Sequence, residues 1–228
     1  MPEIKTRPAR PEEAALGAHL IFLSGPAAFA YGLALPPERV EALLRSLWAR
    51  PGNLFSHSWS YLAVVNGQAQ GLLLGYTGAQ LPGAMLATAR ALWGRVSLRQ
   101  LATMARRGWQ LQRISPRVPR GDYYIAHLAV LPGARRQGIG AHLLGQAERI
   151  ARQEGCRRCS LDVFIENEAA RRLYQRTGYA VERTLHNPRL VGPTGYSGLT
   201  RMTKPLPVSS GQPHLGAGRS RRTVSQAR

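Results

Sequence analysis

A short segment in the second half of the chain joins two arginines to two closely spaced glycines, in the run Arg135-Arg136-Gln137-Gly138-Ile139-Gly140-Ala141. It follows an apolar run and precedes a run with helical periodicity. Glycine lets the main chain approach a ligand closely, and the first amides of a helix have no partner within it. Those amides, the positive end of the helix dipole and the arginine charge all favour an anion. The segment therefore predicts a phosphate-binding turn.

The glycine spacing narrows the class of phosphate ligand. A mononucleotide loop of the form G-x-x-x-x-G-K-[ST] is disfavoured, because neither the lysine nor the hydroxyl residue follows Gly140. The dinucleotide form G-x-G-x-x-G fits poorly, because the next glycine after Gly140 is Gly145. What remains is R-x-x-G-x-G between a strand and a helix. This form resembles the acetyl-coenzyme A signature of the GCN5-related N-acetyltransferase superfamily.

A second stretch looks like the other half of the same signature. It reads Leu-Asp-Val-Phe-Ile-Glu-Asn over residues 161–167 and continues with Ala169, Ala170, Leu173, Tyr174, Gly178 and Tyr179. With both halves in the correct order, the chain is identified as a member of the superfamily, nearest to the branch that contains the ribosomal-protein N-terminal acetyltransferases. The likeness covers residues 123–179. It implies an α/β fold with a mixed, splayed central β-sheet flanked by helices.

The resemblance also implies where acetyl-coenzyme A binds. The pantetheine arm would lie along the strand that ends at Val130 and pair with main-chain groups that a splayed sheet leaves free. The pyrophosphate would rest on the amides of residues 136–141, with Arg135 or Arg136 adding charge. The implied cofactor-binding residues are Leu128, Ala129, Val130, Arg135, Arg136, Gln137, Gly138, Ile139, Gly140, Ala141, Asn167 and Tyr174.

Two residues of the second stretch carry implied roles in cofactor binding and catalysis. Asn167 and Tyr174 are seven residues apart with Ala170 between them, so all three share one helix face. Asn167 resembles the residue that holds the pantetheine amide, although it can equally cap the helix that follows. Tyr174 resembles the tyrosine that protonates the departing thiolate of coenzyme A, although it could instead be packed in the core.

The general base is less well defined by the sequence. An amine arrives protonated at neutral pH and must lose a proton before it attacks a thioester. Asp162 matches the position of a glutamate base in the ribosomal branch, but it could instead be a structural carboxylate. The histone lysine acetyltransferases use a glutamate where this chain has Tyr124. His127 on the same strand is a further candidate, and water remains open.

The composition bounds the class of protein. Thirty-one lysines and arginines against 12 acidic residues give a net charge of +19, which favours acidic surfaces at low salt without requiring a specific nucleic-acid site. The two cysteines, Cys156 and Cys159, fall short of the four ligands of a zinc site, so no metal is expected. The chain starts with charged residues and has no long apolar run, which predicts a cytoplasmic protein without a membrane segment.

The length predicts one domain over residues 1–204, with a helical insertion at about 81–112 and a disordered basic tail over 205–228. We expect strands at 4–8, 60–65, 68–76, 123–130, 159–164, 179–185 and 198–204, and helices at 11–23, 36–48, 139–154 and 167–176. Asn66-Gly67 predicts a type I′ hairpin turn, and Gly155 should end the helix before it. The insertion should contain helices broken near Gly94 and Gly108, and should cover the acceptor side of the site.

The sequence thus predicts an N-acetyltransferase that moves acetyl from acetyl-coenzyme A to a primary amine by direct attack in a ternary complex. Two other classes stay open: a protein that binds acyl-coenzyme A without turnover, and a basic nucleic-acid-binding protein on the same fold. The acceptor is equally open between peptide N-termini, lysine, polyamines, aminoglycosides and small amino compounds. Whether the chain forms a homodimer is not determined by the sequence.

Overall fold

A seven-stranded sheet organises the computed structural model, which describes residues 3–113 and 115–207. The strands are β1 (Ile4–Pro8), β2 (Ser60–Val65), β3 (Gln68–Thr77), β4 (Asp122–Val130), β5 (Arg158–Phe164), β6 (Ala180–His186) and β7 (Gly198–Pro205). Their order is β1-β2-β3-β4-β5-β7-β6, and only the β4–β5 pair is parallel. The predicted mixed sheet is confirmed.

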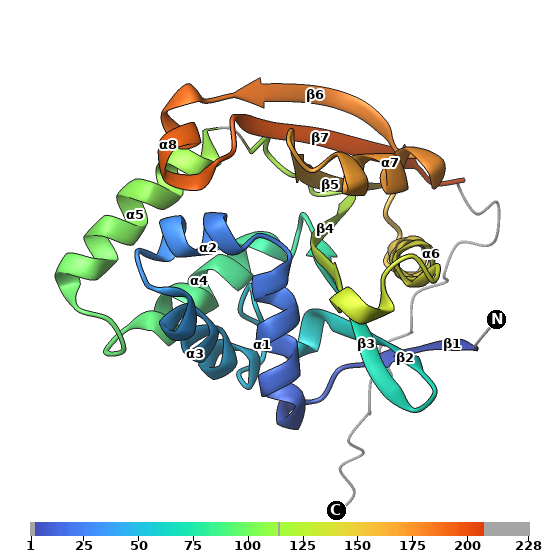
Figure 1. Cartoon of the computed structure of the whole chain (residues 1–228), viewed down its shortest axis with the longest axis horizontal. Helices are drawn as coiled ribbons and strands as arrows, with labels where there is room; N and C mark the ends of the chain where they lie inside the picture. The colour runs from blue at the N-terminus through green and yellow to red at the C-terminus, as the bar shows by residue number, and fades with distance from the viewer. Residues whose placement is uncertain (1–2, 114, 208–228) are drawn as a thin grey trace, which may run out of the picture.

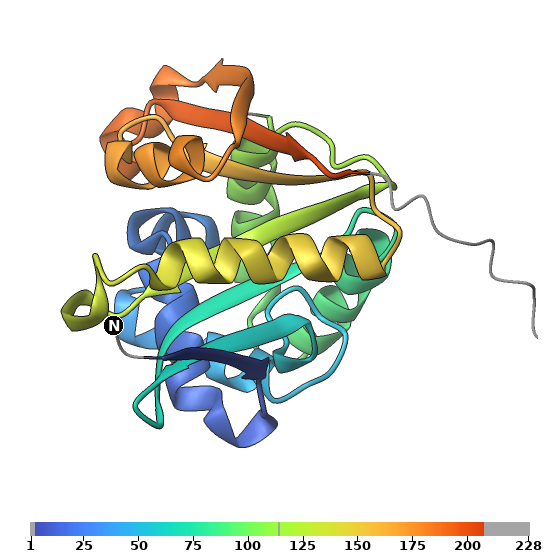
Figure 2. The same cartoon turned by 90° about the vertical axis from the view of Figure 1, so that its right-hand side faces the viewer.

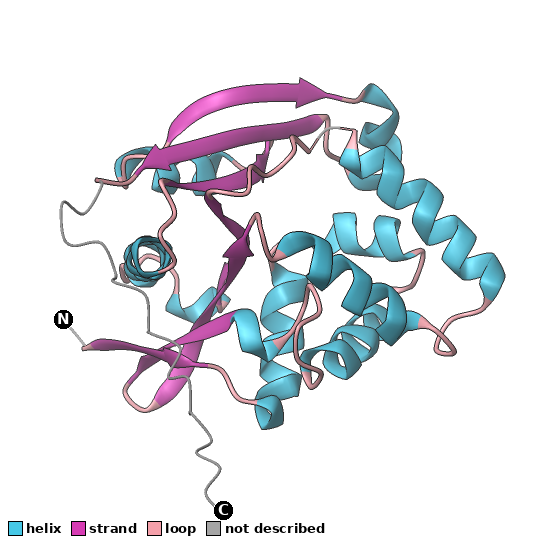
Figure 3. Ribbon diagram, turned by 180° about the vertical axis from the view of Figure 1, so that it is seen from behind, coloured by secondary structure: helices cyan, strands magenta, loops and turns pink. Residues whose placement is uncertain are grey.

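Helices cover both faces of the sheet, as Figures 1 and 3 show. They are α1 (Ala14–Leu23), α2 (Pro26–Leu33), α3 (Pro37–Trp48), α4 (Leu81–Leu92), α5 (Leu98–Gln112), α6 (Ile139–Gln153), α7 (Glu168–Arg176) and the short α8 (Val191–Thr194). Helices α1 to α5 gather on one side, and α6 and α7 lie on the other (Figure 1). Each side has its own buried apolar cluster, so the sheet has a core on each face.

The β2–β3 hairpin shows how local sequence sets the register. Asn66 and Gly67 have φ angles of 50° and 78°, as a type I′ turn requires, and they connect Val65 directly to its partner Gln68. The predicted turn is confirmed. Strand β3 then runs buried through the middle of the molecule and presents its second half to β4.

Strand β4 contains a β-bulge at the centre of the sheet. Leu74 of β3 pairs with His127, and the next residue, Gly75, pairs with Ile125, so Ala126 is an extra residue on β4. Gly75 is required there because a Cβ would lie 2.8 Å from the Tyr124 carbonyl oxygen. The bulge reverses the side-chain alternation, since odd residues face α6 before it and even residues face α6 after it.

The sheet splays between β4 and β5. Their parallel pairing runs from the Asp122–Arg158 pair to the Ile125–Leu161 pair and then stops, although β4 continues to Val130 and β5 to Phe164. Figure 2 shows the two strands diverging from their paired ends, with α6 lying across the sheet beside the gap. This confirms the predicted splay.

The hydrophobicity of α1 comes from its place in the core. Its residues Ala18, Leu20 and Ile21 are fully buried, and the helix packs on α3 and on the sheet. No single described helix is long and apolar enough to cross a membrane, and Pro11–Leu23 with Pro26–Leu33 reach that length only as a pair bent by 98°.

Two expectations about the helices need correction. The break predicted near Gly94 is real, with a φ of 74°, but α5 continues through Gly108 without interruption. A Cβ at Gly108 would meet no other atom, so this glycine weakens the helix without ending it. Helix α2 was not predicted, because its residues carry no polar face.

The predicted C-terminal tail begins inside the folded part of the chain. Strand β7 includes Pro205, and Leu206 is buried, while residues 208–228 of the predicted tail lie outside the described part.

Candidate active site

A cavity of about 1170 Å³ follows β4 and extends to both sides of the splayed strands. Of the residues that the sequence assigned to the cofactor, those lining it are Leu128, Ala129, Val130, Arg135, Arg136, Gly138, Ile139, Gly140, Ala141, Asn167 and Tyr174. Gln137 is not among them, because its exposed side chain turns back and donates to the Gly133 carbonyl at 3.4 Å. Asp162 and His127 also line the cavity.

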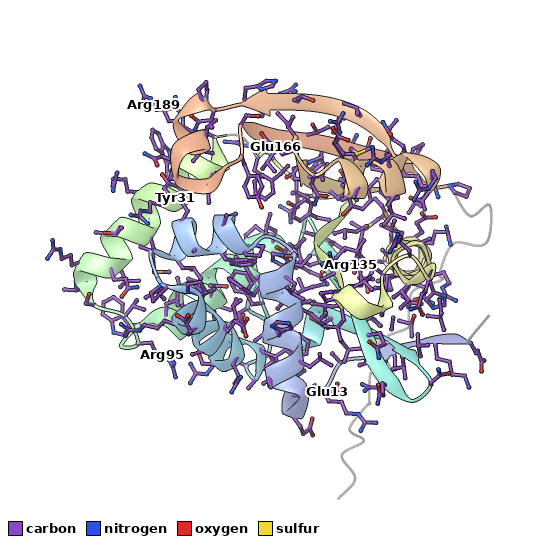
Figure 4. The ribbon with its side chains drawn as sticks, in the orientation of Figure 1. Glu13, Tyr31, Arg95, Arg135, Glu166 and Arg189 are labelled. Carbon is purple, nitrogen blue, oxygen red and sulfur yellow. The ribbon has the colours of Figure 1, made fainter. Side chains whose placement is uncertain are left out.

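The turn before α6 has the geometry of an anion site. Arg136 and Gly138 have φ angles of 63° and 83°, and this left-handed backbone brings the chain sharply into the helix. The first bond of α6 runs from the His142 amide to the Gly138 carbonyl, so the amides of residues 139–141 have no acceptor within the helix. Arg135, labelled in Figure 4 beside the start of α6, is anchored by a bond from Nε to the Val130 carbonyl. Amides and cationic side chains therefore meet at one end of the cavity.

The inner wall of the cavity is the free edge of β4. Beyond Ile125 this strand has no partner on the β5 side, so main-chain groups over residues 126–130 face the gap. An extended ligand that carries amide groups can bind such an edge as an added strand. The side chains of Leu128 and Val130 pack against the α6 core, so these residues serve the core with their side chains and the cavity with their backbone.

Helix α7 forms the opposite wall. Asn167 caps it, since its Oδ1 accepts from the Ala170 amide at 3.2 Å, and the residue lines the cavity. Tyr174 lies about two turns further along the same helix face. It is 8% exposed, and burial raises the pKa of its phenol to about 12. Tyr174 is therefore a neutral hydroxyl at any physiological pH, able to donate a hydrogen bond into the cavity.

Asp162 is held by four donors. Arg201 binds it through Nε at 2.5 Å and Nη2 at 2.9 Å, the Ser115 hydroxyl donates at 2.8 Å, and the Tyr124 hydroxyl donates at 3.0 Å. The two charged side chains are 5% and 1% exposed. Arg201 also donates to the carbonyls of residues 116 and 117. The carboxylate thus ties the segment after α5 to strands β4, β5 and β7, and both of its oxygens are occupied.

His127 is fixed in one tautomer. The Ser24 hydroxyl donates to the Ile21 carbonyl at 2.6 Å, so its oxygen accepts from His127 Nδ1 at 2.8 Å. The ring proton therefore sits on Nδ1, which leaves the lone pair of Nε2 as an acceptor. Burial lowers the pKa of His127 to about 4, so the ring is neutral near pH 7.

The bulge places His127 on the same side of the sheet as α2. Its ring packs against those of Phe29 and Phe55, with centroids 5.3 and 5.9 Å away. Sequence reasoning did not find these two phenylalanines or Ser24, which is 103 residues from His127. The only available signal was the histidine on the cofactor strand.

The insertion closes this side of the cavity. Helix α5 is tied to α2 at Tyr31, whose hydroxyl donates to Gln110 and whose carbonyl accepts from Arg107 at 3.0 Å. Figure 4 shows Tyr31 between the two helices. Met104 and Leu111 of α5 then line the cavity together with residues of α2.

The two cysteines lie away from the cavity lining. Both are free and buried, and burial raises the pKa of both thiols, that of Cys159 to about 12. They are protonated at neutral pH, so they are poor nucleophiles and poor metal ligands in this state.

Comparison with known proteins gives a consistent picture. A family model described as the acetyltransferase (GNAT) family matches residues 41–179, more than half of the chain. The chain is 41% identical over 61 residues to GCN5-related N-acetyltransferase 6, chloroplastic, of Arabidopsis thaliana, covering 27% of this chain and 21% of that protein. It is 46% identical over 55 residues to the aminoalkylphosphonate N-acetyltransferase of Salmonella typhimurium, covering 24% of this chain and 36% of that protein. The chain thus spans less than half the length of these relatives.

Among solved structures, an N-acetyltransferase from Staphylococcus aureus Mu50 has a similar fold. The TM-score is 0.66, with 17% sequence identity over 88% of this chain and 100% of that chain. At this identity the likeness establishes the fold alone.

Proposed function

This chain belongs to the acetyltransferase (GNAT) family, and we propose that it transfers acetyl from acetyl-coenzyme A to a primary amine by direct attack in a ternary complex. One observation carries the proposal. A single cavity runs from the anion-binding turn before α6, along the free edge of β4, to the side covered by α2 and α5. Cofactor and acceptor can therefore enter from opposite sides of the sheet and meet at the bulge.

The residues around the cavity suit cofactor binding. The amides of residues 139–141, with Arg135 and Arg136, would take the pyrophosphate, and the β4 edge would take the pantetheine arm. Asn167 would donate to a pantetheine carbonyl through the amide that its cap leaves free. A thioester held this way lies with its carbonyl near the backbone amides at the end of β4, which can stabilise the developing oxyanion.

Tyr174 would stabilise the leaving group. A thiol has a pKa of about 8.5, well below the pKa of about 12 of this phenol, so the tyrosine holds its proton more tightly than the product thiol does. Its contribution is then a hydrogen bond that grows stronger as negative charge develops on sulfur. Complete proton transfer is not required for that effect.

Proton removal from the amine is assigned to His127 or to a water bound to it, and Asp162 is given a positioning role. His127 Nε2 offers a lone pair inside the cavity, whereas Asp162 Oδ1 already accepts from Arg201, and Oδ2 accepts from Arg201 and from two hydroxyl groups. The apolar surroundings also disfavour the ammonium form of the acceptor, so the amine enters the site largely deprotonated. A weak base such as His127 or water is then sufficient to remove the amine proton.

The likeness of residues 161–167 to the ribosomal N-terminal acetyltransferase branch stays a prediction. In that branch the position of Asp162 carries a base, whereas in this chain Asp162 is paired with Arg201. The branch-specific acceptor, a protein N-terminus, is therefore not part of this proposal.

Thermal unfolding and thiol release together test the proposed function. Acetyl-coenzyme A at about 100 times its Kd should stabilise the native state by about 2.7 kcal/mol, because it binds only the folded form. A panel of primary amines should then release free thiol from the bound cofactor. Stabilisation without thiol release would indicate a binding protein, and salt-dependent stabilisation by DNA or RNA alone would indicate a nucleic-acid-binding protein.

A further inference from the structure

The side of the cavity covered by helices α2 and α5 is lined largely by apolar side chains. They include Phe29, Leu33, Leu47, Phe55, Met104 and Leu111. These residues come from α2, α3, the segment after it and α5, and the rings of Phe29 and Phe55 lie 5.9 Å apart. A ligand in this acceptor chamber is therefore bound mainly by burial of apolar surface.

Three hydroxyl groups in the chamber wall are already engaged. Ser24 donates to Ile21 and accepts from His127. Thr88 donates to the Ala84 carbonyl at 2.8 Å and accepts from the Leu54 amide at 2.9 Å. Tyr124 donates to Asp162. His127 Nε2, in contrast, has no donor among the described residues and can accept a hydrogen bond from a ligand.

The chamber offers no free carboxylate among the described lining residues. Asp162 is the acidic residue in the wall of the cavity, and Arg201 neutralises it. The other charged lining residues are Arg135, Arg136 and Arg176, all cationic. A second ammonium group brought in by an acceptor would find no counter-charge here.

From this lining we infer that the acceptor is a monoamine carrying a bulky apolar group, and that diamines and polyamines are excluded by charge. The inference rests on the proposed acetyl transfer and specifies its substrate class. The reacting amine donates a hydrogen bond to His127 Nε2, and its apolar group fills the space between Phe29, Phe55 and Met104. The bond that forms joins the amine nitrogen to the acetyl carbon, the thioester C–S bond breaks, and the amine proton leaves through His127 or water.

A matched pair of amines tests the charge selection. Hexylamine and 1,6-diaminohexane have the same carbon chain and differ in the second amine. An alkylammonium has a pKa of about 10.4, so at pH 7 the second amine is neutral in fewer than about one molecule in a thousand. We expect kcat/KM for hexylamine to exceed that for the diamine at least about a hundredfold. From propylamine to hexylamine kcat/KM should rise about fourfold per methylene.

Two glutamate variants on one helix provide the control. Met104→Glu places a carboxylate in the chamber, whereas Ala105→Glu places the same charge on the exposed outer face of α5. The hexylamine preference should fall at least about tenfold in Met104→Glu and stay unchanged in Ala105→Glu. Stabilisation by acetyl-coenzyme A shows that each variant is folded.

The outcomes separate this inference from the proposed function. Thiol release that is as fast with the diamine as with hexylamine would overturn the acceptor class and leave acetyl transfer standing. The same holds if both glutamate variants change the preference equally. A protein that neither binds acetyl-coenzyme A nor releases thiol with any amine would overturn the proposed function, and the acceptor class with it.

Discussion

Replacing Asp162 with asparagine distinguishes a catalytic base from a structural carboxylate. The side chain keeps its shape but loses its charge, and one of its oxygens becomes an NH2 group. That group would face donors, because Arg201, Ser115 and Tyr124 all donate to this site. The change therefore leaves a guanidinium that is 1% exposed without its counter-ion.

The expected magnitude follows from that burial. Removing one partner of a buried ion pair costs about 3–5 kcal/mol of unfolding free energy. For a domain of this size each kcal/mol lowers Tm by about 2–4 °C, so Asp162→Asn should lower it by about 6–20 °C. Arg201→Met should cost a similar amount. The double variant Asp162→Asn with Arg201→Met should lose less than the sum of the two single changes, since neither charge is then left alone.

The assay combines thermal unfolding with the pH profile of kcat/KM at a temperature where the variant is folded. A positioning carboxylate predicts a large loss of Tm, with the ascending limb of the profile kept in position. A general base predicts, in addition to the loss of Tm, a rate loss of about 10²–10⁴ and a missing ascending limb. The second pattern would refute the positioning role.

Three further predictions concern the cavity. Tyr174→Phe should lower kcat by about 10–150-fold, the value of one hydrogen bond of about 1.5–3 kcal/mol to a charged group, with the Kd of acetyl-coenzyme A unchanged; an unaltered kcat would remove the tyrosine from the mechanism. His127 titrates near pH 6.5 when unfolded and near 4 when folded, so the unfolded state binds more protons and the unfolding free energy should drop by about 2 kcal/mol from pH 7 to pH 5. His127→Phe should abolish this drop, as denaturant titrations would show. Gly138→Ala, at a φ of 83°, should lower the unfolding free energy in denaturant titrations by about 1–2 kcal/mol, which is the cost of a left-handed alanine; Gly145→Ala inside α6, with open space around it, should not.

Local sequence signals predicted the cofactor side of the molecule well. The turn before α6, the cap at Asn167 and the hairpin at Asn66 are each encoded by a few neighbouring residues, because glycine, asparagine and free helix amides act over one turn. The strand and helix boundaries on this side differ from the prediction by at most two residues.

The acceptor side could not be predicted in this way, because it is built from distant contacts. Asp162 and Arg201 are 39 residues apart, and Ser24 and His127 are 103 apart. Neither pair has a sequence signature. Helix α2 lacks the amphipathic period that identifies surface helices, because it contacts α3, α5 and α8 and also lines the cavity. For the same reason the sequence could not decide whether Asp162 is a general base or a structural carboxylate, since its partner Arg201 is distant in the chain.

The bulge at Ala126 joins the two halves of the site. Without the extra residue, strict alternation would turn His127 toward α6 and away from Phe29 and Phe55, on the face opposite the acceptor chamber. The same irregularity lies where pairing with β5 ends, after Ile125, so the free edge that we propose for the cofactor starts at the point where the side chains of β4 change faces. One inserted residue thus sets both the direction of the proposed proton acceptor and the start of the free edge. The proposed meeting point of the two substrates is therefore a position that neither strand pairing alone would create.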